Sequence, residues 1–250
     1  MGVIGGGDAR GRTRQRVLTG VLAVLVVVLG VLVTDRTAAK ATGIRARWLV
    51  DDVVDFIGIG GPDYAFLRTS DTGQPAHWDH CKPIYYVVNP LHAPPDWQSI
   101  VQEAVDATVA ASGFDFRDGG TTEDREFNVI ARGFAPVLIG WADASEVPIL
   151  GGGVDGYGAF ASHPHGDQLE ATAGAVVLDA GAYSDMGRTA SKEAVFILAH
   201  ELGHVLGLDH VDDIDEVMYR RYAGQEEFGP GDIEGFEVLR DQPCFDADTE

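Results

Sequence analysis

The stretch His200-Glu201-Leu202-Gly203-His204-Val205-Leu206-Gly207-Leu208-Asp209-His210 decides the fold of this 250-residue chain. It follows an apolar run, 194–199, and together the two predict a helix over 192–206 with Ser191 at its start. Residues four apart share one face of a helix, so His200 and His204 can bind one metal ion. Glu201 lies about 100° around the helix axis from His200. That position suits a general base beside the metal rather than a ligand.

Gly207 allows a third ligand to reach the metal. A continued helix would carry His210 away from the metal, whereas glycine at a helix end can adopt the left-handed conformation and turn the chain back. His210 can then supply a third nitrogen. Three protein ligands and one open position are typical of catalytic zinc, while structural zinc sites are closed.

Two other interpretations of these residues are less favoured. A chance occurrence of HExxH is disfavoured because Gly207 and His210 must coincide with it. A structural or inactive zinc site is disfavoured because Glu201 is intact.

The eleven residues resemble the extended zinc motif HExxHxxGxxH of the metzincin metallopeptidases. Met218, eight residues after His210, resembles the Met-turn of that clan, and Tyr219 follows it directly, as in matrixins. The segment 231–239 is similar to the start of the matrixin C-terminal helix, and 78–89 to the first strand of bacterial matrixin-like peptidases. The resemblance covers about residues 76–245.

This resemblance implies an α/β (α+β) zincin fold, with a mixed twisted sheet, three main helices and a Met-turn below the metal. It implies a zinc-dependent endopeptidase that acts on peptides or proteins through a zinc-activated water, with Glu201 as the general base and His200, His204 and His210 as zinc ligands. Met218 would form the floor of the site.

The chain also departs from the family pattern. It lacks the pro-segment motif PRCGxPD, and Val211 replaces the serine that usually follows the third histidine. The segment His163-Pro164-His165-Gly166-Asp167 does not match the spacing of the matrixin structural zinc. A second Zn²⁺ or a Ca²⁺ could bind there, but we favour a solvated polar loop.

Strands are predicted at 84–88, 127–131, 157–160 and 174–179, and further helices at 96–111 and 231–240. One of these segments is a candidate for substrate binding, because an extended peptide can add to a sheet edge as a strand. Its residues are Gly156, Tyr157, Gly158, Ala159 and Phe160. The alternative is an ordinary glycine-rich loop.

The N-terminal part predicts export. Residues 17–33 carry no charge and follow four arginines, which is typical of a signal peptide or a membrane anchor; a buried helix is disfavoured. We therefore predict a signal or anchor over 1–41, a connector over 42–76 and a peptidase domain over 77–250. The domain would be secreted or held outside the cytoplasm by a single span, and we expect a monomer.

Charge excludes one class of protein. The chain has 39 acidic and 18 basic residues, a formal net charge of −21. Residues 1–41 hold six basic and two acidic side chains, so the remainder has a net charge of (18 − 6) − (39 − 2) = −25. Nucleic-acid binding requires a basic surface, so no nucleic-acid partner is expected.

The two cysteines, Cys81 and Cys244, bracket the predicted domain. Outside the cytoplasm a disulfide between them can persist. Two alternatives remain open, namely free thiols or Cys81 as an inhibitory zinc ligand.

Two other functions also remain open. The chain could be a zinc hydrolase with a non-peptide substrate, or a non-catalytic protein of the cell envelope. Turnover of peptides with and without a chelator separates these functions from an endopeptidase.

Overall fold

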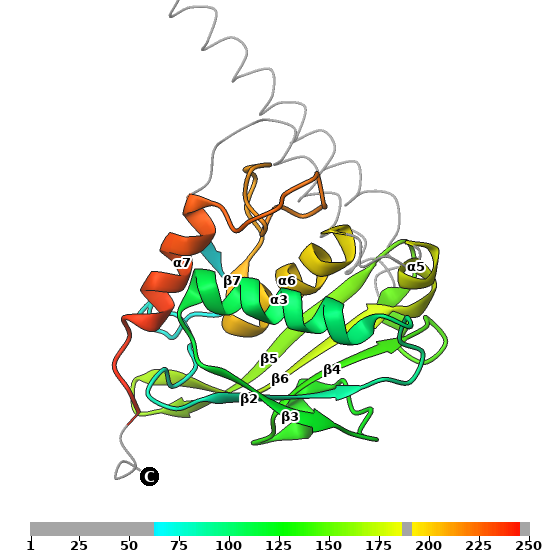
Figure 1. Ribbon diagram of the computed structural model, residues 1–250. Helices are drawn as coiled ribbons and strands as arrows, with labels where there is room; N and C mark the ends of the chain where they lie inside the picture. The colour runs from blue at the N-terminus through cyan, green and yellow to red at the C-terminus, as the bar shows by residue number, and fades with distance from the viewer. Residues whose placement is uncertain (1–62, 187–191, 246–250) are drawn as a thin grey trace, which may run out of the picture. The chain divides into compact units, whose positions relative to one another are not determined.

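The computed structural model describes residues 63–186 and 192–245, all of which belong to one compact unit, Gly61–Glu250 (Figure 1). No helix in this part of the chain has the length and apolar character that a membrane span requires. The run 17–33, predicted to be a signal or an anchor, lies outside the described residues.

A five-stranded mixed sheet forms one layer of the unit, with the strand order β3-β2-β4-β6-β5. Strands β2 (Ile84–Asn89), β3 (Phe116–Thr121), β4 (Val137–Ala142) and β6 (Gln168–Asp179) run parallel. Strand β5 (Gly156–His165) pairs antiparallel with β6 and lies at one edge. The edge strand β5 therefore runs opposite to the other four strands of the sheet.

Two long helices, α3 (Trp97–Ser112) and α6 (Lys192–Leu206), cover one face of this sheet (Figure 1). Helix α3 ends where Gly113 adopts a left-handed φ of 72°, as its C-terminal glycine predicts. A third helix, α7 (Pro230–Arg240), begins with proline, which fits the first helical turn. The mixed sheet and three main helices expected from the sequence are confirmed.

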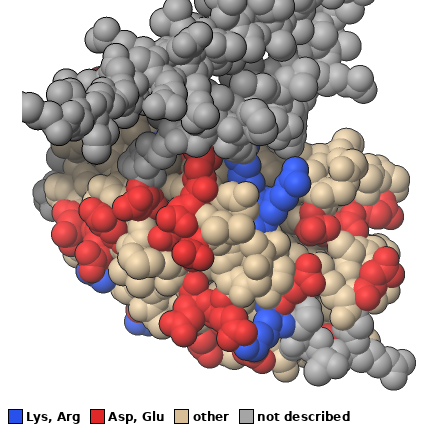
Figure 2. Space-filling view, turned by 90° about the horizontal axis from the view of Figure 1, so that it is seen from above, with Lys and Arg blue, Asp and Glu red and all other residues tan. Residues whose placement is uncertain are grey.

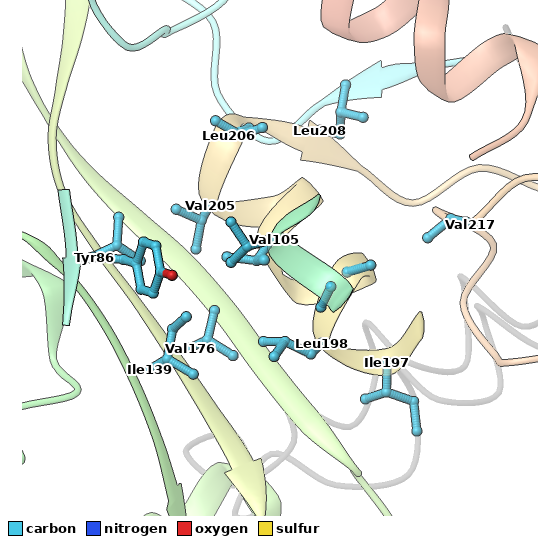
Figure 3. Packing of buried hydrophobic residues seen from close by; sticks show 14 of the residues in the cluster. Tyr86, Val105, Ile139, Val176, Ile197, Leu198, Val205, Leu206, Leu208 and Val217 are labelled. Atoms are coloured by element: carbon cyan, nitrogen blue, oxygen red, sulfur yellow. The ribbon is translucent and has the colours of Figure 1, made fainter. Parts of the chain in front are cut away.

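The main core lies between the sheet and these helices. Figure 3 shows Tyr86, Ile139 and Val176 of the sheet facing Val105 of α3 and Leu198 and Val205 of α6. Each fully buried aliphatic side chain contributes roughly 1.5–3 kcal/mol to folding. Twelve of the fifteen residues of α6 are buried, so this helix is held rigidly by the core.

Shorter elements complete the unit. Strand β1 (Ala65–Phe66) pairs with β7 (Leu208–Asp209), so part of the expected connector 42–76 packs against the residues that precede His210. The remaining elements are α4 (Val129–Arg132), the 3₁₀ helix η1 (Pro148–Leu150) and α5 (Ala180–Asp185).

One strand prediction was wrong. Residues 127–131 do not form a strand, because Asn128 accepts a hydrogen bond from the Ile130 N–H and starts the short helix α4. The strands on either side, β3 and β4, were not predicted. All six residues of β4 are buried, so the strand shows no alternation of polar and apolar residues.

A disulfide joins Cys81, just before β2, to Cys244, just after α7. The two residues are 163 positions apart, and their Cα atoms are separated by 5.9 Å. The bond therefore ties the two ends of the predicted domain to each other.

Candidate metal centre

Helix α6 positions the first two histidines of the motif. His200 and His204 lie one turn apart on its last two turns, and their rings meet nearly at right angles, at 88°. The helix carries both residues on a buried segment, so the core fixes their backbone.

The chain then turns back, as Gly207 predicts. The helix ends at Leu206, and Gly207 has a φ of 123°, which strains any residue with a Cβ. An added Cβ would also lie 3.2 Å from the Ala76 carbonyl oxygen. This turn leads into β7 and returns His210 to the end of α6.

The three imidazoles converge through the same ring nitrogen. The Nε2 atom of His210 lies 3.2 Å from the Nε2 atoms of both His200 and His204. All three potential ligand atoms lie within 4.8 Å of one another.

Hydrogen bonds at the opposite nitrogens orient two of these rings. His200 Nδ1 lies 2.6 Å from the Val217 carbonyl oxygen, and His204 Nδ1 lies 2.8 Å from that of Leu208. A carbonyl oxygen can only accept, so each Nδ1 carries the proton and each Nε2 presents a lone pair. Backbone carbonyls are common partners of metal-bound histidines.

Burial keeps the rings neutral. Burial, together with a neighbouring imidazole in each case, lowers the pKa of His200, His204 and His210 to about 3. The Nε2 lone pairs of His200 and His204 are both directed toward His210 Nε2, 3.2 Å away, so three imidazole nitrogens face one point, as in the three-histidine set of a catalytic zinc site. The residues therefore fit a zinc ion, which favours imidazole nitrogen.

Glu201 lies between α6 and the edge strand β5. Its carboxylate accepts a hydrogen bond from the Gly158 N–H, and burial raises its pKa to about 8. A Cβ at Gly156 would lie 2.9 Å from Glu201 Oε1, and one at Gly158 would lie 2.2 Å from the Glu201 carbonyl oxygen. Only glycine at these two positions lets β5 approach the helix this closely.

Met218 lies beneath the helix in a turn over 216–219, where the Tyr219 N–H donates to the Glu216 carbonyl oxygen. A Cβ at Gly203 would lie 2.4 Å from the Met218 sulfur, so glycine makes room for this side chain. The same turn contains the Val217 carbonyl that orients His200.

The predicted second-metal residues do not join the cluster of three histidines. His163 stacks on Phe134, with ring centroids 5.3 Å apart, and His165 lies 3.5 Å from Glu170. Within 63–186 and 192–245, neither belongs to a group of three or more residues that could hold a metal, so the second metal is unsupported. The predicted substrate-binding residues 156–160 lie on β5, at the edge of the sheet.

Sequence reasoning missed the groups that support the ligands. The carbonyls of Val217 and Leu208 carry no side-chain signal, so their hydrogen bonds to the histidines could not be read from residue types. The charge of Asp155 helps to raise the pKa of Glu201. Asp155 directly precedes the predicted substrate-binding residues 156–160, and this position is the sequence signal that could have identified it.

Comparison with known proteins agrees with this geometry. A family model described as matrixin matches residues 78–239. A search of curated proteins found no match.

Proposed function

The chain belongs to the matrixin family of zinc metalloendopeptidases, and from this premise we propose that it is an exported endopeptidase with His200, His204 and His210 as zinc ligands and Glu201 as general base. The observation that carries this proposal is the convergence of three neutral imidazoles through Nε2.

A bound zinc ion would polarise the scissile carbonyl and activate the attacking water. Glu201 takes a proton from that water and passes it to the leaving amine. Its pKa of about 8 makes it a stronger base than an exposed carboxylate. The positive charge of the metal would lower this pKa toward neutrality, where a general base is most effective.

Strand β5 gives an extended peptide a place to bind. It is one of the two edge strands of the sheet, and Gly156 and Gly158 bring it against Glu201. A peptide that adds to this edge would lie beside the general base. Substrates N-methylated at single backbone positions test this arrangement. Loss of turnover at alternate positions supports strand addition, and uniform tolerance contradicts it.

Export is inferred from the sequence alone. The basic flank and the apolar run 17–33 support it, together with a peptidase domain that we place at 77–250. N-terminal sequencing of the protein from the medium and from membranes of producing cells distinguishes a cleaved signal from a retained anchor. Recovery of the chain only from the cytoplasm would contradict export.

The test of the activity is turnover of a peptide library by the whole chain, with and without a zinc chelator. Chelation should abolish cleavage and added Zn²⁺ should restore it. Stoichiometric zinc without turnover of any peptide would contradict the endopeptidase and favour a non-catalytic role.

A further inference from the structure

Two buried carboxylates lie behind the metal centre and take no part in the chemistry described above. The exposed fraction is 4% for Glu216 and 1% for Asp232. Among the residues that the structure describes, neither forms an ion pair with lysine, arginine or histidine. Burying a carboxylate without a cation is costly, so other contacts must compensate.

Backbone N–H groups provide this compensation, and they do so reciprocally. Asp232, in the first turn of α7, accepts hydrogen bonds from the N–H groups of Val217 and Met218, at 2.6 and 3.2 Å. Glu216, in the Met218 turn, accepts from the N–H groups of Gly231 and Asp232, at 2.9 and 2.8 Å. Each segment thus presents a carboxylate to the other's backbone. The positive end of the α7 dipole stabilises both charges.

Gly229 closes this arrangement. Its N–H donates to Asp232 Oδ2 at 3.0 Å. A Cβ at this position would lie 2.4 Å from Glu216 Oε2, so any larger residue displaces that carboxylate. The backbone at Gly229 is extended, with φ −77° and ψ 174°, so close packing rather than conformation requires glycine.

The Val217–Met218 peptide links Asp232 to the metal centre. Its N–H, that of Met218, donates to Asp232 Oδ1 at 3.2 Å, and its carbonyl, that of Val217, accepts from His200 Nδ1 at 2.6 Å. Glu216 directly precedes Val217 and is tied to the first turn of α7. The position of this peptide therefore depends directly on Asp232 and, through the neighbouring backbone, on Glu216, and the orientation of the His200 ring depends on the peptide.

We propose that Glu216 is a positioning residue for the metal centre: with Asp232 it forms a reciprocal carboxylate clasp that fixes the Val217–Met218 peptide and thereby aims His200 Nε2. This inference rests on the proposed role of His200 as a zinc ligand. A carboxylate that only capped α7 would stabilise the helix without affecting metal affinity.

The test compares Glu216→Gln with a matched control, Asp79→Asn. Asp79 is also a buried carboxylate, but it pairs with Lys82 and the Cys81 N–H, far in sequence from the Met218 turn. Zinc affinity is measured on the metal-free whole chain by competition with a chelator, and the cobalt-substituted proteins are compared by visible absorption.

We expect Glu216→Gln to weaken zinc binding about 10-fold and to alter the cobalt spectrum, in the range usual for groups that orient metal ligands. Asp79→Asn should change neither. Unchanged zinc affinity and spectrum in a less stable Glu216→Gln protein would overturn the proposal, because Glu216 would then serve the fold alone. Absence of zinc binding by the unmodified chain would instead overturn the proposed function, and this inference with it.

A second variant keeps the test decisive if Glu216→Gln does not fold. Gly229→Ala retains both acids but pushes the Glu216 carboxylate aside. It should weaken zinc binding in the same direction. Affinity equal to that of the unmodified chain would contradict the clasp.

Discussion

Glu201 shares helix α6 with two of the histidines, yet its carboxylate is held by β5 rather than by the imidazole cluster. Removing this carboxylate should therefore lower the catalytic rate without lowering the affinity for zinc. We expect Glu201→Ala to keep zinc and to lose at least about 10² in rate, the usual contribution of a general base. Metal analysis and peptide turnover check this result. Glu193→Ala, at an exposed position on the same helix, is the control and should retain the rate. A zinc-replete Glu201→Ala protein with full turnover would rule out the proposed role.

His210 is the one proposed ligand that lies outside α6. We expect His210→Ala to weaken zinc binding strongly, since two helical histidines alone form a poor catalytic set. Chelator competition on the metal-free protein measures the loss. Should affinity and activity persist, the third ligand is another group, and Asp209 is the first to examine.

At the scale of elements, Asp232 links helix α7 to the turn below the metal, and its titration should affect stability. Burial raises its pKa to about 7, whereas an unfolded aspartate titrates near about 3.9. Because the folded pKa is the higher one, the folded state binds the extra proton between these values. The stabilisation that Asp232 gives the folded state by binding this proton is complete below about pH 4 and is lost as the pH rises through 7.

Comparison of Asp232→Asn with the unmodified chain isolates this effect, since other titrating groups are common to both proteins. The free energy of unfolding is measured by denaturant titration between pH 5 and 8. The unmodified chain should lose stability with rising pH more steeply than the variant. Parallel pH profiles would show that Asp232 does not titrate in this range.

At the scale of the whole molecule, the Cys81–Cys244 disulfide closes a loop of 163 residues. In the chain-entropy model such a bond contributes up to roughly 5 kcal/mol, although real disulfides often deliver less. We expect the double variant Cys81→Ser, Cys244→Ser to have a lower Tm than the oxidised chain. A reductant should lower the Tm of the unmodified protein and leave that of the double variant unchanged. Equal Tm values for all forms would show that the bond does not stabilise the domain.

The charge of the molecule is a second property at this scale. Figure 2 shows acidic side chains spread widely over the face it presents, with few basic ones among them. Such a surface attracts cations, and the range of this attraction decreases as the salt concentration rises. We expect kcat/KM for a lysine-rich peptide to fall as the salt concentration rises, and that for a matched neutral peptide to change little. The same salt dependence for both peptides would exclude electrostatic steering.

Much of the site could be predicted from the sequence because its signals are local. Four-residue spacing places His200 and His204 on one helical face, and a glycine at 207 permits the turn that returns His210. Helix α6 was predicted over 192–206, its observed range, because its apolar run and helix length are properties of neighbouring residues. The matrixin fold follows from the same eleven residues through the family resemblance.

Only the tertiary structure decided the rest, because long-range contacts override local pattern. Strand β4 is buried on both faces, so its sequence carries no alternation, and the expected strand at 127–131 gives way to a capped helical turn. Strand β5 approaches Glu201 closely because Gly156 and Gly158 have no Cβ. Glu201 lies more than forty positions further along the sequence, so no local pattern reveals this contact. The clasp between Glu216 and Asp232 uses backbone N–H groups, which every residue but proline possesses, so only folding reveals which of them the two acids bind.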